Sequence, residues 1–218
     1  MSAISHALTI NAPLRYEKIE DEVFAVEGTP ADCVTLAVEN LLAGPPDLVV
    51  SGINRGANLG DDIAYSGTVA GAMEGAMLGI RAFAVSLASK THGDYSHAAA
   101  FAAQLARLLD EKTLPRRTFL NVNVPVGQIR GVRVTSQGRR EYRAKVEERV
   151  DPRSRVYFWI KEGFSRWEKN GVSDITAVRE SHISVTPLQI DLTNYKALDD
   201  VVSWNMKWNG GPEKTAKE

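Results

Sequence analysis

Two glycine-bounded polar loops hold the residue types in this chain that are best suited to phosphate chemistry. The first reads SGINRG, follows an apolar run and contains Asn54, whose side-chain oxygen is the kind of hard ligand that Mg²⁺ or Mn²⁺ prefers. The second reads YSGT and precedes a stretch rich in Ala, Gly and Met. Ser66, Gly67 and Thr68 would present backbone N–H groups and hydroxyls to an anion at a helix start. From spacing alone, a plain helix cap and tight turns explain the same residues equally well.

An alternation of strands and helices must position these loops. Continuous apolar runs such as residues 48–50 are typical of strands buried on both faces, and apolar spacings of three and four are typical of helices. The predicted elements are strands at 7–16 and 23–27, a helix at 30–42, a strand at 48–50, a helix at 68–79, a strand at 81–87, a helix at 97–111 and a strand at 118–125. This order predicts an α/β fold with a parallel, doubly wound sheet, which binds ligands beyond the carboxyl ends of its strands.

The first long helix has a clear start and stop. Thr29 is a predicted N-cap, Pro30 suits the first helical position, and Asp32 lies in the first turn, where a negative charge is favourable. Gly44-Pro45-Pro46 then ends the helix.

From about residue 130 the pattern changes. Short apolar runs at 132–138, 156–160 and 183–188 follow without long helices between them, and residues 138–180 are charged and aromatic. This stretch predicts a β-rich arm outside the parallel core, while the polar tail at 209–218 is expected to be disordered. We therefore divide the chain into a core at 1–130 and a β-rich C-terminal region at 131–218.

Composition excludes several classes of protein. The chain has 218 residues and a formal net charge of −1, which gives no electrostatic reason to expect binding to nucleic acid or to a membrane surface. Its single cysteine, Cys33, cannot form an internal disulfide, and no apolar run approaches the roughly 18 residues of a membrane span. The N-terminus does not read as a secretory signal, so we expect a cytoplasmic protein.

The loop segment SGINRGANLGDDIAYSGTVAGAMEGAMLGI closely resembles the SurE family of metal-dependent 5′-nucleotidases. The segments HALTINAPLR, GTPADCV, FLNVNVP, RVTSQGRR and VRESHISVTPLQIDLT resemble other blocks of that family in the same order, over about residues 1–195. The resemblance implies a SurE-like, three-layer α/β/α Rossmann-like sheet with a β-rich C-terminal arm. It also implies hydrolysis of nucleoside 5′-monophosphates at a phosphate site formed by Ser66, Gly67 and Thr68.

The family's metal site uses two adjacent aspartates, a serine and an asparagine. Asn54 matches the asparagine, and Ser2 matches the serine, with Ser5 as a rival. The aspartates have no counterpart, because the resemblance begins after the family's first strand–helix–strand unit of about 30 residues; Asp61 and Asp62 match the family in place and do not substitute for the pair. We expect one divalent cation per subunit, Mn²⁺ or Mg²⁺, held weakly by this chain, with little turnover. The catalytic residues stay unknown.

Other polar residues have ordinary structural explanations that do not require a role in the site. The histidines share no ligand spacing (His6, His92, His97 and His182), and Cys33 lies on the interior face of a helix. Arg139 and Arg140 fit a contact with a phosphate, a contact with a neighbouring subunit, or a solvated surface. Glu74 either faces the site or meets a buried partner.

The sequence leaves two alternatives for the function and two for the role of the arm. A non-catalytic nucleotide-binding or assembly protein is the alternative to a nucleotidase. The aromatic arm at 138–180 suits either a subunit interface or a hairpin on its own domain. The resemblance favours an oligomer, a homodimer or homotetramer.

Overall fold

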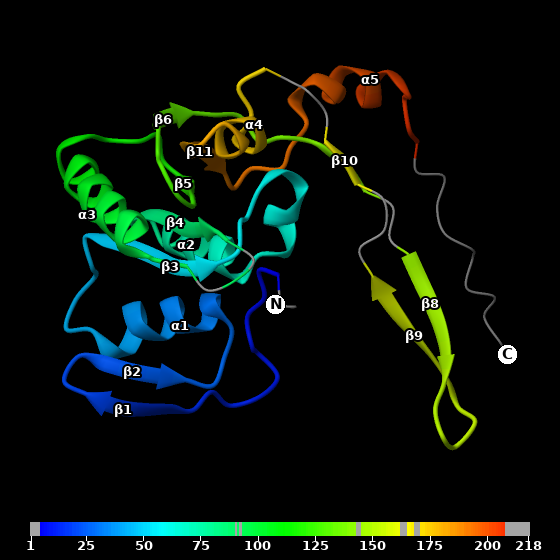
Figure 1. Ribbon diagram of the computed structural model, residues 1–218, viewed down its shortest axis with the longest axis horizontal. Coiled ribbons are helices and arrows are strands. Elements are labelled where there is room, and N and C mark those ends of the chain that lie inside the picture. Colours follow the sequence, from blue (N-terminus) through cyan, green and yellow to red (C-terminus); the bar gives the residue numbers. More distant parts are fainter. Residues whose placement is uncertain are drawn as a thin grey trace, which may run out of the picture.

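The computed structural model describes residues 5–89, 91, 93–142, 145–161, 165–167 and 171–207. Its centre is a five-stranded sheet in the order β3-β4-β5-β11-β6 (Figure 1). The strands are β3 (Leu48–Arg55), β4 (Arg81–Ala88), β5 (Thr118–Pro125), β6 (Gly131–Val134) and β11 (His182–Gln189). β3, β4 and β5 are parallel to one another, whereas β11 is antiparallel to β5 and parallel to β6. The sheet is therefore mixed, with the predicted parallel strands forming one side of it.

Helices cover both faces of the sheet, because successive strand residues point to opposite sides. On β4, Phe83 packs in an apolar cluster with residues of helix α3 (Ser96–Glu111), whereas Ala84 packs in a second cluster with residues of helix α2 (Gly67–Met77). The two helices thus lie on opposite faces, and the molecule has the three layers expected of this class.

Helix α2 lies very close to β3 and runs opposite to it. A Cβ atom built on Gly75 would lie 2.8 Å from the Val49 side chain, and one on Gly71 would lie 2.7 Å from the Ser51 hydroxyl. The glycines of this helix are therefore required by its contact with the strand. These two contacts are four residues apart on the helix and two residues apart on the strand, and both spacings correspond to about 6 Å. One further step of four helix residues places Gly67, the first residue of α2, level with the end of β3.

Helix α1 (Pro30–Leu36) begins as predicted and continues as a π-helical turn at Ala37–Leu41. The Thr29 hydroxyl accepts from the backbone N–H of Asp32, and the Asp32 carboxylate accepts from the backbone N–H of Thr29, which completes a capping box. The hairpin of β1 (Tyr16–Glu20) and β2 (Val23–Val26) lies beyond α1 in Figure 1.

Two strand predictions are wrong. Within 7–16, only Tyr16 belongs to a strand, and the rest of β1 (Tyr16–Glu20) lies between the two predicted strands. The reason is that the Thr9 N–H and hydroxyl both donate to Asp32, which takes this backbone away from a ladder. Strand β3 is not buried on both faces, since Val50 is 46% exposed. It stands at the end of the sheet and pairs only with β4 among the described residues.

The C-terminal part supplies short elements around the sheet. Here β6 and β11 join the central sheet, while β8 and β9 form a separate hairpin that projects away from the body in Figure 1. The other elements are β7 (Arg140–Tyr142), β8 (Lys145–Val150), β9 (Val156–Lys161), β10 (Ser165–Trp167), helices α4 (Asp174–Arg179) and α5 (Leu198–Ser203), and 3-10 turns η2 (Gly60–Tyr65) and η3 (Tyr195–Ala197). The tail at 209–218 lies outside the described residues. Among the described helices, none has the length and apolarity to cross a membrane.

Candidate functional site

Asn54 lies at the end of β3, at the edge where the parallel strands finish. Its side-chain Nδ2 donates to the carbonyl of Gly56 at 2.9 Å, and the N–H of Gly56 donates to the Leu87 carbonyl at 2.9 Å. Gly56 adopts a φ of +115°, which a residue with a Cβ rarely adopts. Because the amide nitrogen of Asn54 is used to close this turn, its carbonyl oxygen Oδ1 is the atom left to act as a ligand.

The start of α2 forms what we call the phosphate cradle, residues Ser66, Gly67 and Thr68. The Ser66 hydroxyl accepts from the N–H of Val69 at 3.1 Å, so Ser66 is an N-cap. The first backbone bond of the helix runs from the Ala70 N–H to the Ser66 carbonyl, which leaves the N–H groups of Gly67 and Thr68 without an intrahelical acceptor. Ser66 is therefore the helix cap that the sequence indicates, and this cap leaves the backbone N–H groups of its two neighbours available for a hydrogen bond from outside the helix.

The cradle and Asn54 lie at the same edge of the sheet. The contacts of Gly71 with Ser51 and of Gly75 with Val49 place the first turn of α2 beside the last residues of β3. A phosphate on the cradle amides would thus have the Asn54 turn as its neighbour. Ser2, the other predicted metal ligand, lies outside the described residues, and its rival Ser5 is exposed.

A network of buried amides below these loops was not predicted. Asn123 accepts from the backbone N–H of Asn58 at 2.8 Å, and its own Nδ2 donates to the Asn58 carbonyl at 2.9 Å. Asn121 donates to the same carbonyl at 2.8 Å, and the Asn58 side chain donates to the Ser86 hydroxyl at 2.7 Å. The signal in the sequence was the pair of asparagines at alternate positions of an apolar strand, which places both on one face.

Asp174 is a second unpredicted polar residue, and it is fully buried. Its carboxylate accepts from the N–H groups of Gly60 at 2.9 Å, Gly138 at 2.9 Å and Ile175 at 2.7 Å. Burial raises the pKa of Asp174 above its ordinary value, although these backbone hydrogen bonds lower it in part. The residue joins the turn before the cradle to the loop that precedes Arg139.

Glu74 is itself buried, and its partners are partly buried residues of other segments. On α2, its carboxylate contacts His6 Nε2 at 2.7 Å and accepts from the Thr35 hydroxyl at 3.1 Å. Asp61 and Asp62 lie in the first turn of η2. Cys33 is half-buried in α1, and burial raises the pKa of its thiol, with a further contribution from the nearby Asp32.

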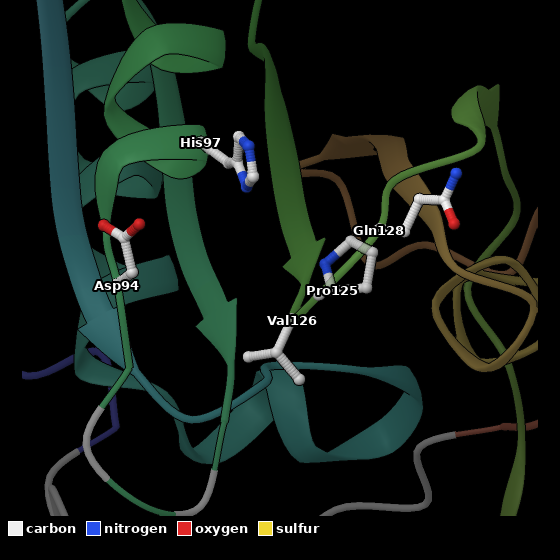
Figure 2. A pocket seen from close by; sticks show the side chains of 6 residues that line it. Asp94, His97, Pro125, Val126 and Gln128 are labelled. Carbon is white, nitrogen blue, oxygen red and sulfur yellow. The ribbon is translucent and has the colours of Figure 1, made fainter.

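A hollow of about 430 Å³ lies at the end of β5 on the face covered by α3. Figure 2 shows His97 in the first turn of that helix and Asp94 on the loop just before it, across from Val126 and Gln128. The Asp94 carboxylate is already used by Ser96, whose N–H and hydroxyl both donate to it at 2.8 Å. This hollow lies on the opposite face of the sheet from α2 and does not include the cradle.

The described residues do not by themselves fit a divalent cation. Such ions are held mainly by carboxylates, whereas Asn54 contributes one neutral oxygen. Among the described residues, no group of three or more His, Cys, Asp or Glu side chains lies together as a metal site. We therefore derive no catalytic step through a metal.

Comparison with known proteins identifies the family to which this chain belongs. The family model "Survival protein SurE" matches residues 1–144, and the chain belongs to the SurE family. A protein named 5′-nucleotidase SurE from Syntrophotalea carbinolica is 51% identical over 210 residues, which cover 95% of this chain and 84% of that protein. One of the same name from Geobacter sulfurreducens is 52% identical over 209 residues, covering 94% and 80%.

A solved structure agrees with this membership. The crystal structure of the SurE protein from Aquifex aeolicus superimposes with a TM-score of 0.82 at 40% identity, and covers 94% of this chain and 85% of that one. The family and the fold predicted from the sequence are thus confirmed. The relatives, each named a 5′-nucleotidase, also support the predicted hydrolase class.

Proposed function

We propose that this chain is a metal-dependent 5′-nucleotidase that hydrolyses nucleoside 5′-monophosphates to nucleoside and phosphate. The observation that carries this proposal is the position of Asn54 beside the free N–H groups at the start of α2, at the carboxyl edge of the parallel strands. The names of the relatives support the same reaction.

In this proposal the cradle binds the phosphate of the nucleotide. The N–H groups of Gly67 and Thr68 donate to two phosphate oxygens, and the positive end of the α2 dipole favours the negative charge that they carry. The Ser66 hydroxyl keeps its hydrogen free to donate to a third oxygen, because it acts only as an acceptor toward Val69. The cradle thus orients the phosphoryl group so that a nucleophile can approach the phosphorus from the side opposite the leaving oxygen.

The proposal includes one divalent cation per subunit, Mn²⁺ or Mg²⁺, with Asn54 and Ser2 among its ligands. It also includes a cytoplasmic location and no nucleic-acid or membrane partner; all of these stay predictions.

Phosphate release from AMP by the purified chain, with millimolar Mn²⁺, tests the reaction. We expect release that falls by about 10- to 100-fold in Asn54→Ala, while Asn194→Ala, a change at an exposed asparagine, behaves as wild type. Stabilisation by AMP without release would favour the non-catalytic alternative. The absence of both would contradict the proposal. The wild-type release is itself expected to be small, because Asn54 and Ser2 supply no carboxylate to the cation, and robust release would contradict that expectation.

We further propose that the β8–β9 hairpin is the oligomerisation arm of the C-terminal region. Large apolar side chains on this hairpin are exposed, including Phe158 at 59%, Trp159 at 53% and Ile160 at 75%. A two-stranded hairpin with exposed faces is marginally stable alone in water, so a second copy of the chain that covers these residues would stabilise it.

Light scattering on a charged variant of the hairpin tests the arm. Ile160→Asp should lower the mass of the assembly, because a buried charge at an interface is strongly unfavourable. Leu192→Asp is the matched control, since Leu192 is 91% exposed and lies outside the hairpin. A wild-type chain that is monomeric at all concentrations would contradict this proposal.

A further inference from the structure

The connecting segment, residues 55–65, joins Asn54 to the phosphate cradle. It bends at Gly56, where φ is +115°, and at Gly60, where φ is +54° and η2 begins, and η2 then leads into Ser66. Any movement of this segment would displace the cradle relative to Asn54. What holds the segment therefore decides the geometry of the site.

The first anchor is Asn123 on β5. Its side-chain oxygen accepts from the backbone N–H of Asn58 at 2.8 Å, and its Nδ2 donates to the carbonyl of Asn58 at 2.9 Å. Asn123 itself is 0% exposed, so these bonds are made without competition from water. The segment is in this way attached directly to the central sheet, 65 residues further along the chain.

The second anchor is Asp174 at the start of α4. One carboxylate oxygen accepts from the N–H of Gly60, and the other accepts from the N–H of Gly138. A Cβ atom on Gly60 would lie 2.9 Å from the Gly138 carbonyl oxygen, so the two loops are in direct contact. Asp174 thus locks the connecting segment to the loop before Arg139.

Part of this buried layer is unfavourable for stability. Oδ1 of Asn121 is buried without a hydrogen-bond partner among the described residues, although Nδ2 of the same side chain donates to the Asn58 carbonyl. An apolar side chain would avoid that unpaired acceptor.

We propose that Asn123 and Asp174 are positioning residues for phosphate binding and hydrolysis. Each holds one point of the connecting segment, and together they keep the cradle at a fixed place relative to Asn54. This inference rests on the proposed function, because it assigns these side chains to the same phosphate site.

Asp174→Asn is the sharpest test. It preserves the side-chain volume but replaces an acceptor oxygen with an amide nitrogen that faces the N–H of Gly60 or Gly138. Asp32→Asn is the matched control, because Asp32 is a buried carboxylate that also accepts backbone N–H groups, away from the connecting segment. Where both variants are folded, the Kd for AMP should rise about tenfold or more in Asp174→Asn, with kcat/KM falling about 10- to 100-fold, and stay within about twofold of wild type in Asp32→Asn.

A second variant and its control make the test independent of Asp174→Asn alone. Asn123→Ala should weaken AMP binding in the same way, whereas Thr186→Ala removes a buried polar side chain that bonds Thr135 and does not touch the segment. Hydrogen exchange supplies a readout without substrate: amides of residues 55–65 should exchange faster in Asp174→Asn and Asn123→Ala than in their controls.

The outcomes separate the two proposals. If each variant and its control lose stability alike, with AMP affinity and exchange at 55–65 unchanged, the positioning role is wrong while the proposed function stands. If the wild-type chain neither binds nor hydrolyses AMP, the proposed function is wrong, and hydrogen exchange still decides whether Asp174 and Asn123 hold the segment.

Discussion

The chain contains two buried aspartates that both organise backbone, and they differ in what they stabilise. Asp32 accepts from the backbone N–H of Thr29, the N-cap of its own helix, and from the backbone N–H and hydroxyl of Thr9, 23 positions away. Asp174 accepts from Gly60 and Gly138, which lie far from it in the sequence. Asp32 thus completes the cap of α1 and holds the N-terminal segment against it, whereas Asp174 joins the turn that precedes the phosphate cradle to the loop at Gly138.

Their pKa values move in opposite directions. Burial alone would raise the pKa of Asp32, but hydrogen bonds from Thr9 and Thr29 outweigh it and hold that pKa below its ordinary value. Burial raises the pKa of Asp174, and its backbone donors do not compensate in full. The fold therefore stabilises the charged form of Asp174 less than that of Asp32.

The largest effect is expected from Gly60→Ala. A Cβ at this position would meet the Gly138 carbonyl oxygen at 2.9 Å, and the φ of +54° is one that alanine adopts at a cost of about 1–2 kcal/mol. Both effects push apart the loops that Asp174 joins, so we expect kcat/KM for AMP to fall by about tenfold or more.

Gly79→Ala separates displacement from backbone strain. Gly79 also has a positive φ, +82°, but a Cβ there would meet nothing within 4 Å. Steady-state kinetics on both variants at a temperature where each is folded should show the loss in Gly60→Ala alone. Equal losses would mean that strain anywhere in the fold, and not contact with Gly138, controls the site.

A smaller effect is expected from removing the helix caps beside the two aspartates. Thr29→Ala and Ser173→Ala each delete an N-cap hydroxyl, which typically destabilises a protein by about 1 kcal/mol. We expect both to lower the Tm, but only Ser173→Ala, next to Asp174, to weaken AMP binding, by a few-fold. Calorimetric titration with AMP checks this, and a weaker affinity in Thr29→Ala of the same size would remove the distinction between the two regions.

The smallest effect is expected in the pH dependence of stability. Because the folded pKa of Asp32 is lowered, its contribution is present above the unfolded pKa and is lost as the pH falls through the folded value. The folded pKa of Asp174 is raised, so its contribution is present below the unfolded pKa and is lost as the pH rises through the folded value. Urea unfolding as a function of pH should show Asp32→Asn flattening the lower part of the profile and Asp174→Asn the weakly acidic part. The same change in both variants would contradict these assignments.

Much of this fold was predictable because it depends on local patterns. The capping box of Thr29 and Asp32, the small residues of α2 and the N-cap at Ser66 all follow from neighbouring residues. The strand predicted at 7–16 failed because Thr9 bonds a side chain 23 positions away. The link between Gly60 and Asp174 spans 114 positions, and no local pattern in either segment points to the other.

The central claim is that a nucleotide phosphate binds the N–H groups at the start of α2. Amide chemical shifts of the ¹⁵N-labelled 218-residue chain during titration with AMP test it directly. We predict that the largest shifts are at Gly67 and Thr68, with small ones at Val126 and Gln128 in the hollow on the opposite face. Large shifts at that hollow with none at Gly67 and Thr68 would contradict the account.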